Sequence, residues 1–143
     1  MSKREQSNLS VASPRRFTLA KSRILRGKRY FQRLFAEGTL IHTPLITLRY
    51  IIDEDPETDF KVGFIAPKRT GKAVDRNRSK RLLRESFRLQ QHAINDLLAE
   101  HQLRVHMVFI AKKSLSNYSD VTDQVTSLLD KLRNRLLSQS TPN

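Results

Sequence analysis

The stretch GKAVDRNRSKRLLRESFR, residues 71–88, is strongly cationic and also predicts the central helix of the chain. No Pro or Gly occurs from Lys72 to Gln102, so a long helix is expected after Pro67 and Gly71. At roughly 100° per residue, one group of polar side chains falls within about 100° of arc. This stripe contains Asn77, Lys80, Arg81, Arg84 and Arg88. The opposite side, expected to pack on a sheet, receives Ser79, Leu82, Leu83, Ser86 and Leu89, with Phe87 on its flank.

The charged residues of this stripe all have the same sign, which is unusual for a helix surface. A solvated helix face normally mixes acidic and basic residues, and such a face is the simplest alternative interpretation. Here Lys80 stands one turn before Arg84, and Arg84 one turn before Arg88, which is a repulsive arrangement. Only Asp75 and Glu85 reduce the charge, and Arg outnumbers Lys, which suits bidentate phosphate contact. The stripe is therefore predicted to bind nucleic acid, together with Arg76, Arg78, Lys68, Arg69 and Lys72 around its start.

The composition of the whole chain agrees with a polyanionic partner. The 143 residues are enough for one domain, and 27 Lys and Arg against 14 Asp and Glu give a formal net charge of +13. An acidic membrane surface is the competing partner, but no apolar run approaches the roughly 18 residues that span a bilayer, and neither end has a lipidation signal. The absence of cysteine excludes disulfides, thiolate metal sites and a cysteine nucleophile, and it fits a reducing cytoplasm.

The chain is expected to form a single domain over residues 17–137. Residues 1–16, MSKREQSNLSVASPRR, lack the apolar block of a secretory signal and are predicted to form a disordered basic tail, with a transit peptide as the alternative. Residues 138–143 are predicted to form a flexible C-terminal tail.

The N-terminal half of the domain is expected to contain a helix and a hairpin. KRYFQRLFAEG, residues 28–38, has helical spacing and ends on Gly38, which suits a left-handed cap. LITLRYII, residues 45–52, predicts a strand whose even positions form the more apolar face. The acidic DEDPETD, residues 53–59, is expected to turn into a strand from Phe60, with TLIHT, residues 39–43, as a possible extra strand.

The C-terminal half is expected to add a strand and a helix. RVHMVFIA, residues 104–111, predicts the strand, and a helix capped by Ser119 or Asp120 follows. The apolar face of this helix contains Val121, Val125, Leu128, Leu129, Leu132 and Leu136. The order of elements predicts an α+β fold, a small sheet covered by helices.

Catalytic chemistry is not expected from this chain. His42, His92, His101 and His106 lack metal-ligand spacing, and the acidic residues gather in the segment 53–59 without a calcium-loop pattern. No Gly-rich phosphate loop occurs either, because PKRTGK lacks Walker spacing.

Four stretches resemble the bacterial ribonuclease P protein component. The Arg-Asn-Arg triplet followed by Lys-Arg and Arg-Glu in residues 71–88 resembles the signature of that family. YFQRLFAEG resembles its first helix, VGFIAPKR a strand leading to a basic pair, and VFIAKK its last strand. The resemblance runs from about residue 17 to residue 137.

The resemblance implies a subunit of an endoribonuclease, ribonuclease P, which removes the 5′ leader of precursor tRNA. In this family the RNA subunit carries out the Mg²⁺-dependent cleavage, so no catalytic residue, metal or cofactor is expected on the protein. The implied state is a cytoplasmic monomer within a ribonucleoprotein, with the RNA subunit and precursor tRNA as partners and no membrane contact. The implied fold is an αβββαβα sandwich with a left-handed βαβ crossover. Residues that match the RNA-subunit-binding positions or extend them are Lys68, Arg69, Lys72, Arg76, Asn77, Arg78, Lys80, Arg81, Arg84 and Arg88.

The family also holds the leader in a cleft between the first helix and the sheet. The matching positions here are Phe31, Phe35, Thr47, Arg49 and Ile65. Bases stack on aromatic rings with little sequence preference, at about 1–3 kcal/mol per base. Taken alone, aromatic residues four apart on a helix indicate a core face instead.

Three departures from the family pattern carry consequences. Arg49 stands where an aromatic residue is common, so a phosphate contact is expected in place of stacking. Pro67 lacks an N–H, so the preceding strand must end there or lie at an edge. His106 stands where Asp is frequent.

Two other functions remain open from the residues alone. A ribosomal or other structural RNA-binding protein would have the same charge and size. A DNA-binding regulator would need a helix-turn-helix pattern, which is not found before the basic helix.

Overall fold

The computed structural model describes residues 18–52 and 60–140, and these form the predicted αβββαβα order. The helices are α1 (Lys28–Glu37), α2 (Ala73–Glu100) and α3 (Tyr118–Ser140), with short 3₁₀ turns η1 (Lys21–Arg23) and η2 (Lys68–Thr70). The strands are β1 (Thr39–His42), β2 (Ile46–Ile52), β3 (Phe60–Ile65) and β4 (Val105–Ala111). The predicted tail 1–16 and acidic turn 53–59 lie outside the described residues. Helix α3 continues three residues past the predicted end of the domain at residue 137.

The strands form one sheet in the order β1-β2-β4-β3, so the predicted hairpin between residues 45–52 and the strand from Phe60 is wrong. β4 lies between β2 and β3, antiparallel to β2 and parallel to β3. Its residues are buried on both faces except for Ile110, which suits a central strand. The hairpin of this fold is β1–β2, where the backbone N–H of Thr43 donates to the carbonyl of Ile46 at 2.9 Å.

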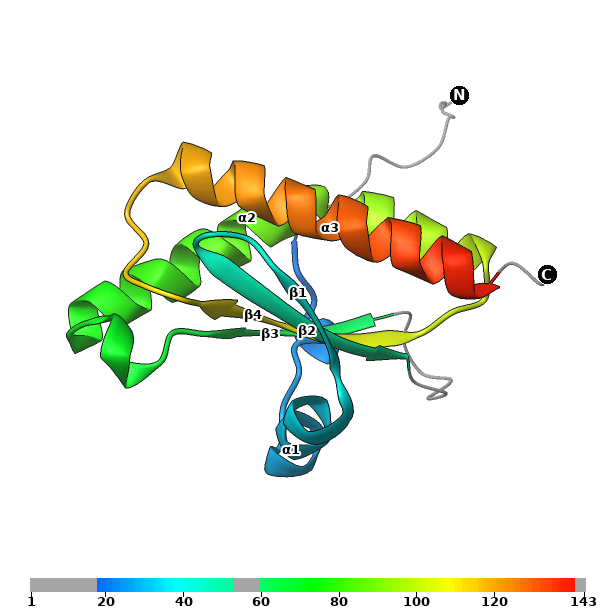
Figure 1. Cartoon of the computed structure of the whole chain (residues 1–143), viewed down its shortest axis with the longest axis horizontal. Coiled ribbons are helices and arrows are strands. Elements are labelled where there is room, and N and C mark those ends of the chain that lie inside the picture. The colour runs from blue at the N-terminus through cyan, green and yellow to red at the C-terminus, as the bar shows by residue number, and fades with distance from the viewer. Residues whose placement is uncertain (1–17, 53–59, 141–143) are drawn as a thin grey trace, which may run out of the picture.

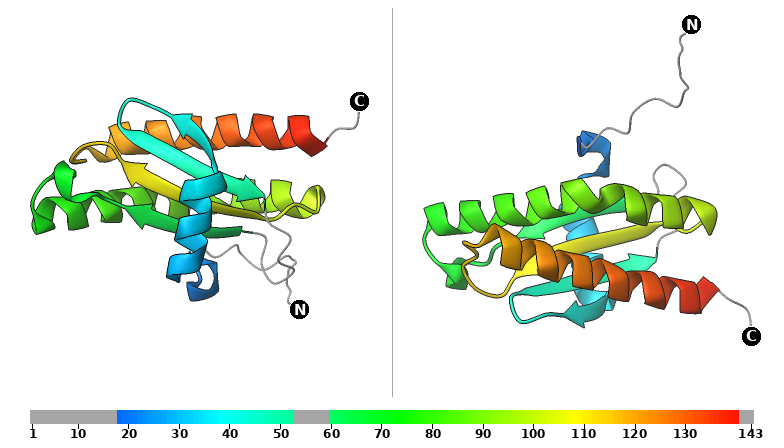
Figure 2. Two further views of the ribbon diagram at one scale, coloured as in Figure 1. Left: turned by 60° about the horizontal axis from the view of Figure 1, so that its bottom comes forward. Right: turned by 90° about the horizontal axis from the view of Figure 1, so that it is seen from above.

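The sheet separates two layers of helices. Helices α2 and α3 cover one face, and α1 crosses the other (Figures 1 and 2). The face under α2 and α3 carries Ile46, Leu48 and Tyr50 of β2, which confirms the predicted apolar face of that strand. The predicted apolar face of α3 is also buried. β3 and β4 are neighbouring parallel strands joined through α2, which is the βαβ unit implied by the family resemblance.

The face of helix α2 that packs in the core differs from the predicted one. Phe87, expected on the flank, is fully buried, and its ring lies 5.5 Å from that of Phe60 and 5.6 Å from that of Phe109. Leu89, expected on the packing face, is 44% exposed. The reason is that α2 packs on the sheet and on α3 together, so its buried arc centres on Leu83 and Phe87 and leaves Leu89 beyond its edge.

Two predicted helix caps are wrong, although the first helix does end before Gly38, and one prediction about a strand end is confirmed. Gly38 is extended (φ −71°), and glycine is needed there because a Cβ would lie 2.4 Å from the carbonyl oxygen of Leu34. The first turn of α3 is capped by Asn117, whose Oδ1 accepts from the backbone N–H of Asp120 at 3.0 Å. As Pro67 required, β3 ends at Ile65 and is also an edge strand.

Candidate nucleic-acid interface

The start of α2 is held by a local cap. Gly71 has a φ of +140°, and a Cβ at this position would lie 2.9 Å from the side chain of Asp75. The Asp75 carboxylate accepts a hydrogen bond from the backbone N–H of Lys72 at 3.2 Å. This carboxylate therefore satisfies one free N–H of the first turn, and it fixes the direction in which the cationic stripe leaves the loop.

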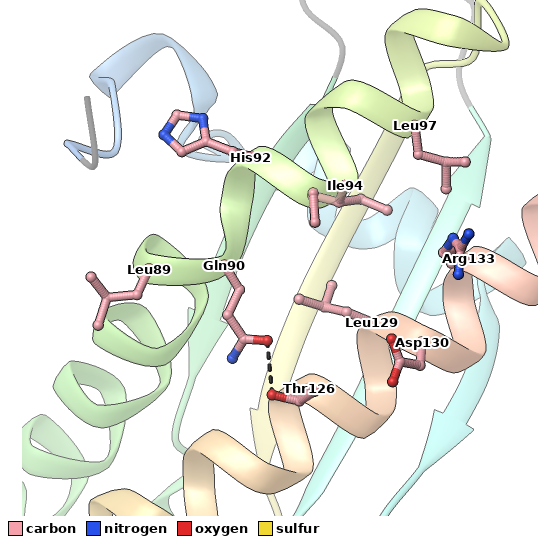
Figure 3. Close-up of a pocket in the computed structure, with 10 residues that line it drawn as sticks. Leu89, Gln90, His92, Ile94, Leu97, Thr126, Leu129, Asp130 and Arg133 are labelled. Carbon is pink, nitrogen blue, oxygen red and sulfur yellow. Dashed lines mark hydrogen bonds between the residues drawn. The ribbon is translucent and has the colours of Figure 1, made fainter. Parts of the chain in front are cut away.

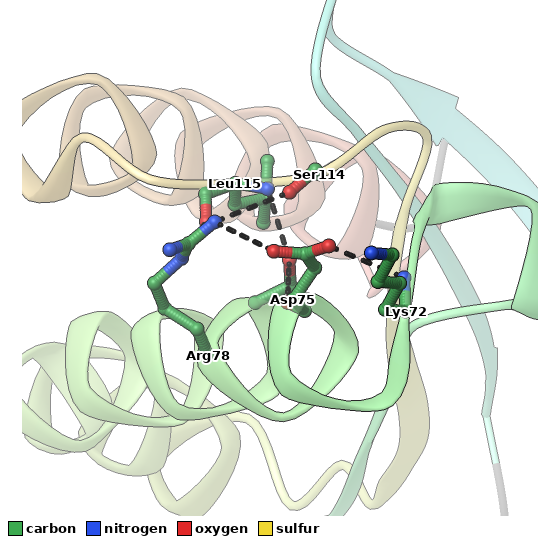
Figure 4. A network of polar contacts seen from close by, with 6 residues as sticks. Lys72, Asp75, Arg78, Ser114 and Leu115 are labelled. Carbon is green, nitrogen blue, oxygen red and sulfur yellow. Dashed lines mark hydrogen bonds and ion pairs between the residues drawn. The ribbon is translucent and has the colours of Figure 1, made fainter.

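Arg78 is tied to other parts of the chain by hydrogen bonds, although its side chain is 43% exposed (Figure 4). Its Nε donates to the backbone carbonyl of Leu115 at 3.3 Å, and its Nη2 lies 3.3 Å from Oδ1 of Asp75. Beside it, the Ser79 hydroxyl accepts from the backbone N–H of Leu115 at 2.9 Å. These bonds tie the start of α2 to the segment that leads into α3. The first role of Arg78 is thus anchoring, and its predicted RNA contact stays a prediction.

Four members of the stripe remain exposed. Asn77, Lys80, Arg81 and Arg84 have no hydrogen bond or ion pair among the described residues. Because no carboxylate among the described residues pairs with Lys80, Arg81 or Arg84, these three cations present a net positive field to solvent.

Arg88, the last member of the stripe, is paired with Glu85. Its Nε donates to Oε2 of Glu85 at 3.2 Å, and its Nη2 bonds to the other carboxylate oxygen. The hydrogen bond from Arg88 lowers the pKa of the Glu85 carboxyl below its ordinary value. Arg88 is therefore partly neutralised, unlike the cations before it.

The exposed stripe forms one wall of a groove of about 470 Å³. Phe31 of α1 lies on another side of the same groove, and Gly63 and Phe64 of β3 also line it. A Cβ at position 63 would lie 3.1 Å from the Phe31 ring, so glycine leaves room for the ring to approach the strand. The other lining residues are Ile24, Leu25, Asn77, Lys80, Arg81 and Arg84. The fold therefore brings the cationic stripe and Phe31, one of the predicted leader-cleft residues, into the lining of the same groove.

The other predicted cleft residues lie on the sheet face that α1 crosses. Phe31 and Ile65 belong to a second apolar cluster built around Leu25, Leu34 and Val108. Leu34 is the fully buried residue of α1, whereas Phe31 is half-buried and Phe35 is 43% exposed. The fold therefore does not bury Phe31 and Phe35 together as a core face of α1.

Arg49 contacts the C-terminal end of α1. Its guanidinium lies 5.1 Å from the centre of the Phe35 ring, and its Nη1 donates to the Phe35 carbonyl at 3.1 Å. The contact combines a cation–π interaction with a bond to a free helix carbonyl. Thr47, on the same strand face as Arg49, shares a 3.2 Å hydrogen bond with Nδ1 of His42. Both polar groups therefore have partners within the chain.

The remaining predicted RNA contacts lie at the entrance to α2. Lys68 and Arg69 are exposed on η2, and Lys72 is exposed at the N-cap of α2. Arg76 is half-buried, and its Nε has no hydrogen-bond partner in the described structure. These residues extend the positive surface beyond the groove without lining it.

A larger cavity, of about 550 Å³, lies between α2 and α3 (Figure 3). It is lined mainly by apolar side chains such as Leu89, Ile94 and Leu129, and Gln90 and Thr126 hydrogen-bond beside it at 2.8 Å. Its single lysine or arginine is Arg133. With so little positive charge, it is a weaker candidate for nucleic acid than the smaller groove.

Sequence reasoning missed part of the groove. Ile24, Leu25, Gly63 and Phe64 became visible only through the long-range contacts of the fold. One signal was present in KSRILRGKR, residues 21–29, which holds five cations and no acid beside the groove-lining Ile24 and Leu25.

Neither a metal site nor a membrane-spanning helix occurs within residues 18–52 and 60–140. In these ranges no group of three or more His, Cys, Asp or Glu side chains could hold a metal ion, and no helix is long and apolar enough to cross a bilayer. His106 is buried and packs edge-on against the Tyr30 ring at 5.2 Å.

Comparison with known proteins gives concordant results. Residues 19–133 match the family model described as Ribonuclease P. The ribonuclease P protein component of Nitratiruptor is 32% identical over 114 residues, covering 78% of this chain and 93% of the relative. That of Syntrophus aciditrophicus is 34% identical over 120 residues, covering 82% and 92%.

Solved structures share the fold. The RNase P protein of Staphylococcus aureus superposes with a TM-score of 0.64 at 20% identity, covering 78% of this chain and 96% of the other. The RNase P protein of Thermotoga maritima gives a TM-score of 0.61 at 24% identity, covering 76% and 96%.

Proposed function

The chain belongs to the ribonuclease P protein family, and from this premise we propose that it helps a catalytic RNA subunit to remove the 5′ leader of precursor tRNA. The protein binds both RNAs, and the RNA subunit carries out the Mg²⁺-dependent endonucleolytic cleavage. The protein acts as a cytoplasmic monomer within the ribonucleoprotein and contributes binding and positioning rather than a chemical step.

The observation that supports this proposal most directly is the shared groove. Exposed cations on one wall suit the phosphates of a folded RNA, whose binding is dominated by electrostatics. An aromatic ring on another side suits an unpaired base, which offers a face for stacking in any sequence. The groove thus has the chemistry for a junction between a structured RNA and a single strand.

We assign the two RNA partners to different sides of this groove and to the surfaces that continue from them. The RNA subunit binds Lys80, Arg81 and Arg84, with Asn77 beside them and with the basic residues at the start of α2. The leader occupies the face between α1 and the sheet, where it stacks on Phe31 and passes Phe35, Ile65 and Thr47. Arg49 holds Phe35 in place at 5.1 Å, and its remaining N–H groups offer a phosphate contact.

Reconstitution tests this function. Purified chain is added to the cognate ribonuclease P RNA at low Mg²⁺, and processing of precursor tRNA is followed. We expect stimulation of cleavage with the chain and no cleavage by the chain alone. Lack of stimulation would favour a general structural RNA-binding protein, and cleavage without the RNA subunit would contradict the assignment of chemistry to RNA.

Replacement of Phe31 tests the cleft. We expect Phe31→Ala to weaken holoenzyme binding of precursor tRNA by roughly 1–3 kcal/mol for each base that no longer stacks and to leave mature tRNA binding unchanged. Tyr30→Leu is the matched control, because Tyr30 belongs to the same apolar cluster but contacts His106 and Lys61 instead of the groove. Equal weakening for precursor and mature tRNA would make Phe31 a packing residue only.

A further inference from the structure

A second cationic surface lies on the approach to α1. From residue 18 to residue 36 the sequence has five Lys or Arg before Gln32 and no Asp or Glu. Four of these cations are exposed and have no hydrogen bond or ion pair with any described residue. They are Lys21, Arg26, Lys28 and Arg29, and we name them the N-terminal bank.

The backbone that carries this bank is fixed to the sheet. The N–H of Leu25 donates to the carbonyl of Val62 at 2.8 Å, and Ile24 forms a parallel bridge to the same residue of β3. The Leu25 side chain is 4% exposed and packs in the apolar cluster under α1. Gly27, with a φ of +96°, then turns the chain into α1. The cations on either side of this corner are therefore presented from a structured segment.

The bank does not have the charge pattern of an ordinary solvated surface. Helix α3 offers the comparison within the same chain, because it carries three acidic residues, Asp120, Asp123 and Asp130, and three basic ones, Lys131, Arg133 and Arg135. Mixed signs of this kind cancel over short distances, whereas like charges repel. An uncompensated cluster on a structured segment indicates an anionic partner.

The position of the bank identifies the kind of anion. Ile24 and Leu25, which lie among the cations of residues 21–29, line the same groove as Phe31 and the exposed stripe of α2. The groove thus has the cations of α2 and apolar or aromatic groups in its lining, and the N-terminal bank flanks two of its lining residues in the sequence. A base can stack on apolar or aromatic groups of this kind only when it lies outside a duplex, because within a duplex the neighbouring stacked bases cover its faces. A single strand fits this arrangement better than a duplex does.

We propose that Lys21, Arg26, Lys28 and Arg29 bind phosphates of the 5′ leader where the strand leaves the groove. The inference rests on the proposed function and adds a specific contact to it. The stripe of α2 is assigned to the RNA subunit, and the bank, which flanks the groove-lining Ile24 and Leu25, is a separate positive surface for the substrate strand. Longer leaders therefore gain affinity from this surface in a salt-dependent way.

The first experiment measures holoenzyme affinity against salt concentration. The variant Arg26→Ala/Lys28→Ala is compared with wild type on two precursor tRNAs, one whose leader ends within the groove and one whose leader continues beyond it. For the longer leader we expect the slope of log affinity against log salt to fall by roughly 1.4, about 0.7 for each phosphate of a single strand that the protein no longer neutralises. The slope for the shorter leader and the affinity for the RNA subunit stay unchanged.

The control is Lys131→Ala/Arg133→Ala, which removes two exposed cations from α3 and leaves all slopes unchanged. An unchanged slope for the longer leader in Arg26→Ala/Lys28→Ala overturns the proposal. An equal change for both leaders, or weaker binding of the RNA subunit alone, overturns it as well. Failure of the proposed function is recognised separately, since wild-type protein would then not stimulate processing.

A second experiment locates the strand directly. The chain has no cysteine, so Lys28→Cys provides a single attachment point for a photoreactive group. In the assembled holoenzyme we expect crosslinks from position 28 to leader nucleotides outside the groove, and none from Arg133→Cys. Crosslinks from position 28 to the RNA subunit alone would overturn the proposal.

Discussion

Helices α2 and α3 lie side by side on one face of the sheet (Figure 2). Their basic side chains differ in whether they have partners within the chain. In α2 the cations Lys80, Arg81 and Arg84 have no partner among the described residues. In α3, Lys131 lies 3.5 Å from the carbonyl of His42, and Arg135 donates to the carbonyl of Leu40 at 3.3 Å. The comparison teaches that a count of charges does not identify a binding surface, because the neighbouring carbonyls and carboxylates decide which charges remain available.

The α3 cations have a structural use at the sheet edge. β1 is an edge strand, and the carbonyls of Leu40 and His42 are the groups that Arg135 and Lys131 approach. Charged side chains over an edge discourage pairing with another strand. Lys131 and Arg135 thus protect the edge of the sheet, while the exposed cations of α2 remain available to a partner.

The largest effect is expected from the core that the two helices share. Phe87→Ala should lower the free energy of unfolding by about 3–5 kcal/mol, because the ring is fully buried between Phe60 and Phe109. Leu132→Ala in α3, also fully buried, should cost about 2–5 kcal/mol. Denaturant unfolding measures both. A decrease under about 1 kcal/mol at either site would mean that the helix is not anchored as described.

The next largest effect is expected on RNA-subunit binding, and it should occur for α2 variants but not for α3 variants. Arg81→Ala/Arg84→Ala should reduce the salt slope of RNA-subunit binding by roughly 1.4–1.8, about 0.7–0.9 per phosphate contact, and weaken the binding. Its stability should change by no more than about 0.5 kcal/mol, because both side chains lie at the surface. Filter binding over a salt series provides the measurement, with Lys131→Ala/Arg133→Ala as the matched pair. Equal slopes for the two double variants would remove the distinction between α2 and α3.

A smaller effect is expected where the two helices are tied together. Arg78→Ala removes the bonds to the carbonyl of Leu115 and to Asp75, and should cost about 1–2 kcal/mol of stability. Thermal and denaturant unfolding test this value. If stability is unchanged, the anchoring role is wrong. The salt slope of the same variant decides independently whether Arg78 also contacts the RNA subunit.

The smallest effect concerns the pair that ends the stripe. The hydrogen bond from Arg88 lowers the pKa of Glu85, so the pair stabilises the fold above the ordinary glutamate pKa, and this contribution disappears as pH falls through the lowered value. An NMR titration should show the Glu85 carboxyl titrating below the usual range, and Arg88→Gln should return it there.

Glu85→Gln should act in the opposite direction on binding. It frees Arg88 from its carboxylate partner, so the salt slope for the RNA subunit should rise by at most about 0.9, the value of one phosphate contact. A fall in the slope would show that Glu85 does not restrain Arg88.

The sequence was sufficient for the parts of the fold that depend on local periodicity. The order of elements, the length of α2 and the apolar faces of β2 and α3 followed from spacing alone. The position of β4 did not, because strand order depends on which buried edges meet, and residues 104–111 lie far along the chain from both of their partners.

The candidate site was likewise predictable only in part. Helical periodicity predicted that Lys80, Arg81 and Arg84 share a face, and they line one groove. It could not reveal that Arg78 bonds to Leu115, 37 residues away, or that Gly63 makes room for Phe31. Those contacts depend on tertiary packing, which has no periodic signal.

The central place of β4 has a consequence for synthesis on the ribosome. β3 and the β1–β2 hairpin emerge before the strand that joins them, and α2 emerges before β4 and α3, on which it packs. Until residue 111 has left the exit tunnel, the nascent chain therefore presents open strand edges and apolar side chains, which are the features that make a partly folded chain prone to aggregation. Completion of the sheet is consequently a late event in the synthesis of each molecule.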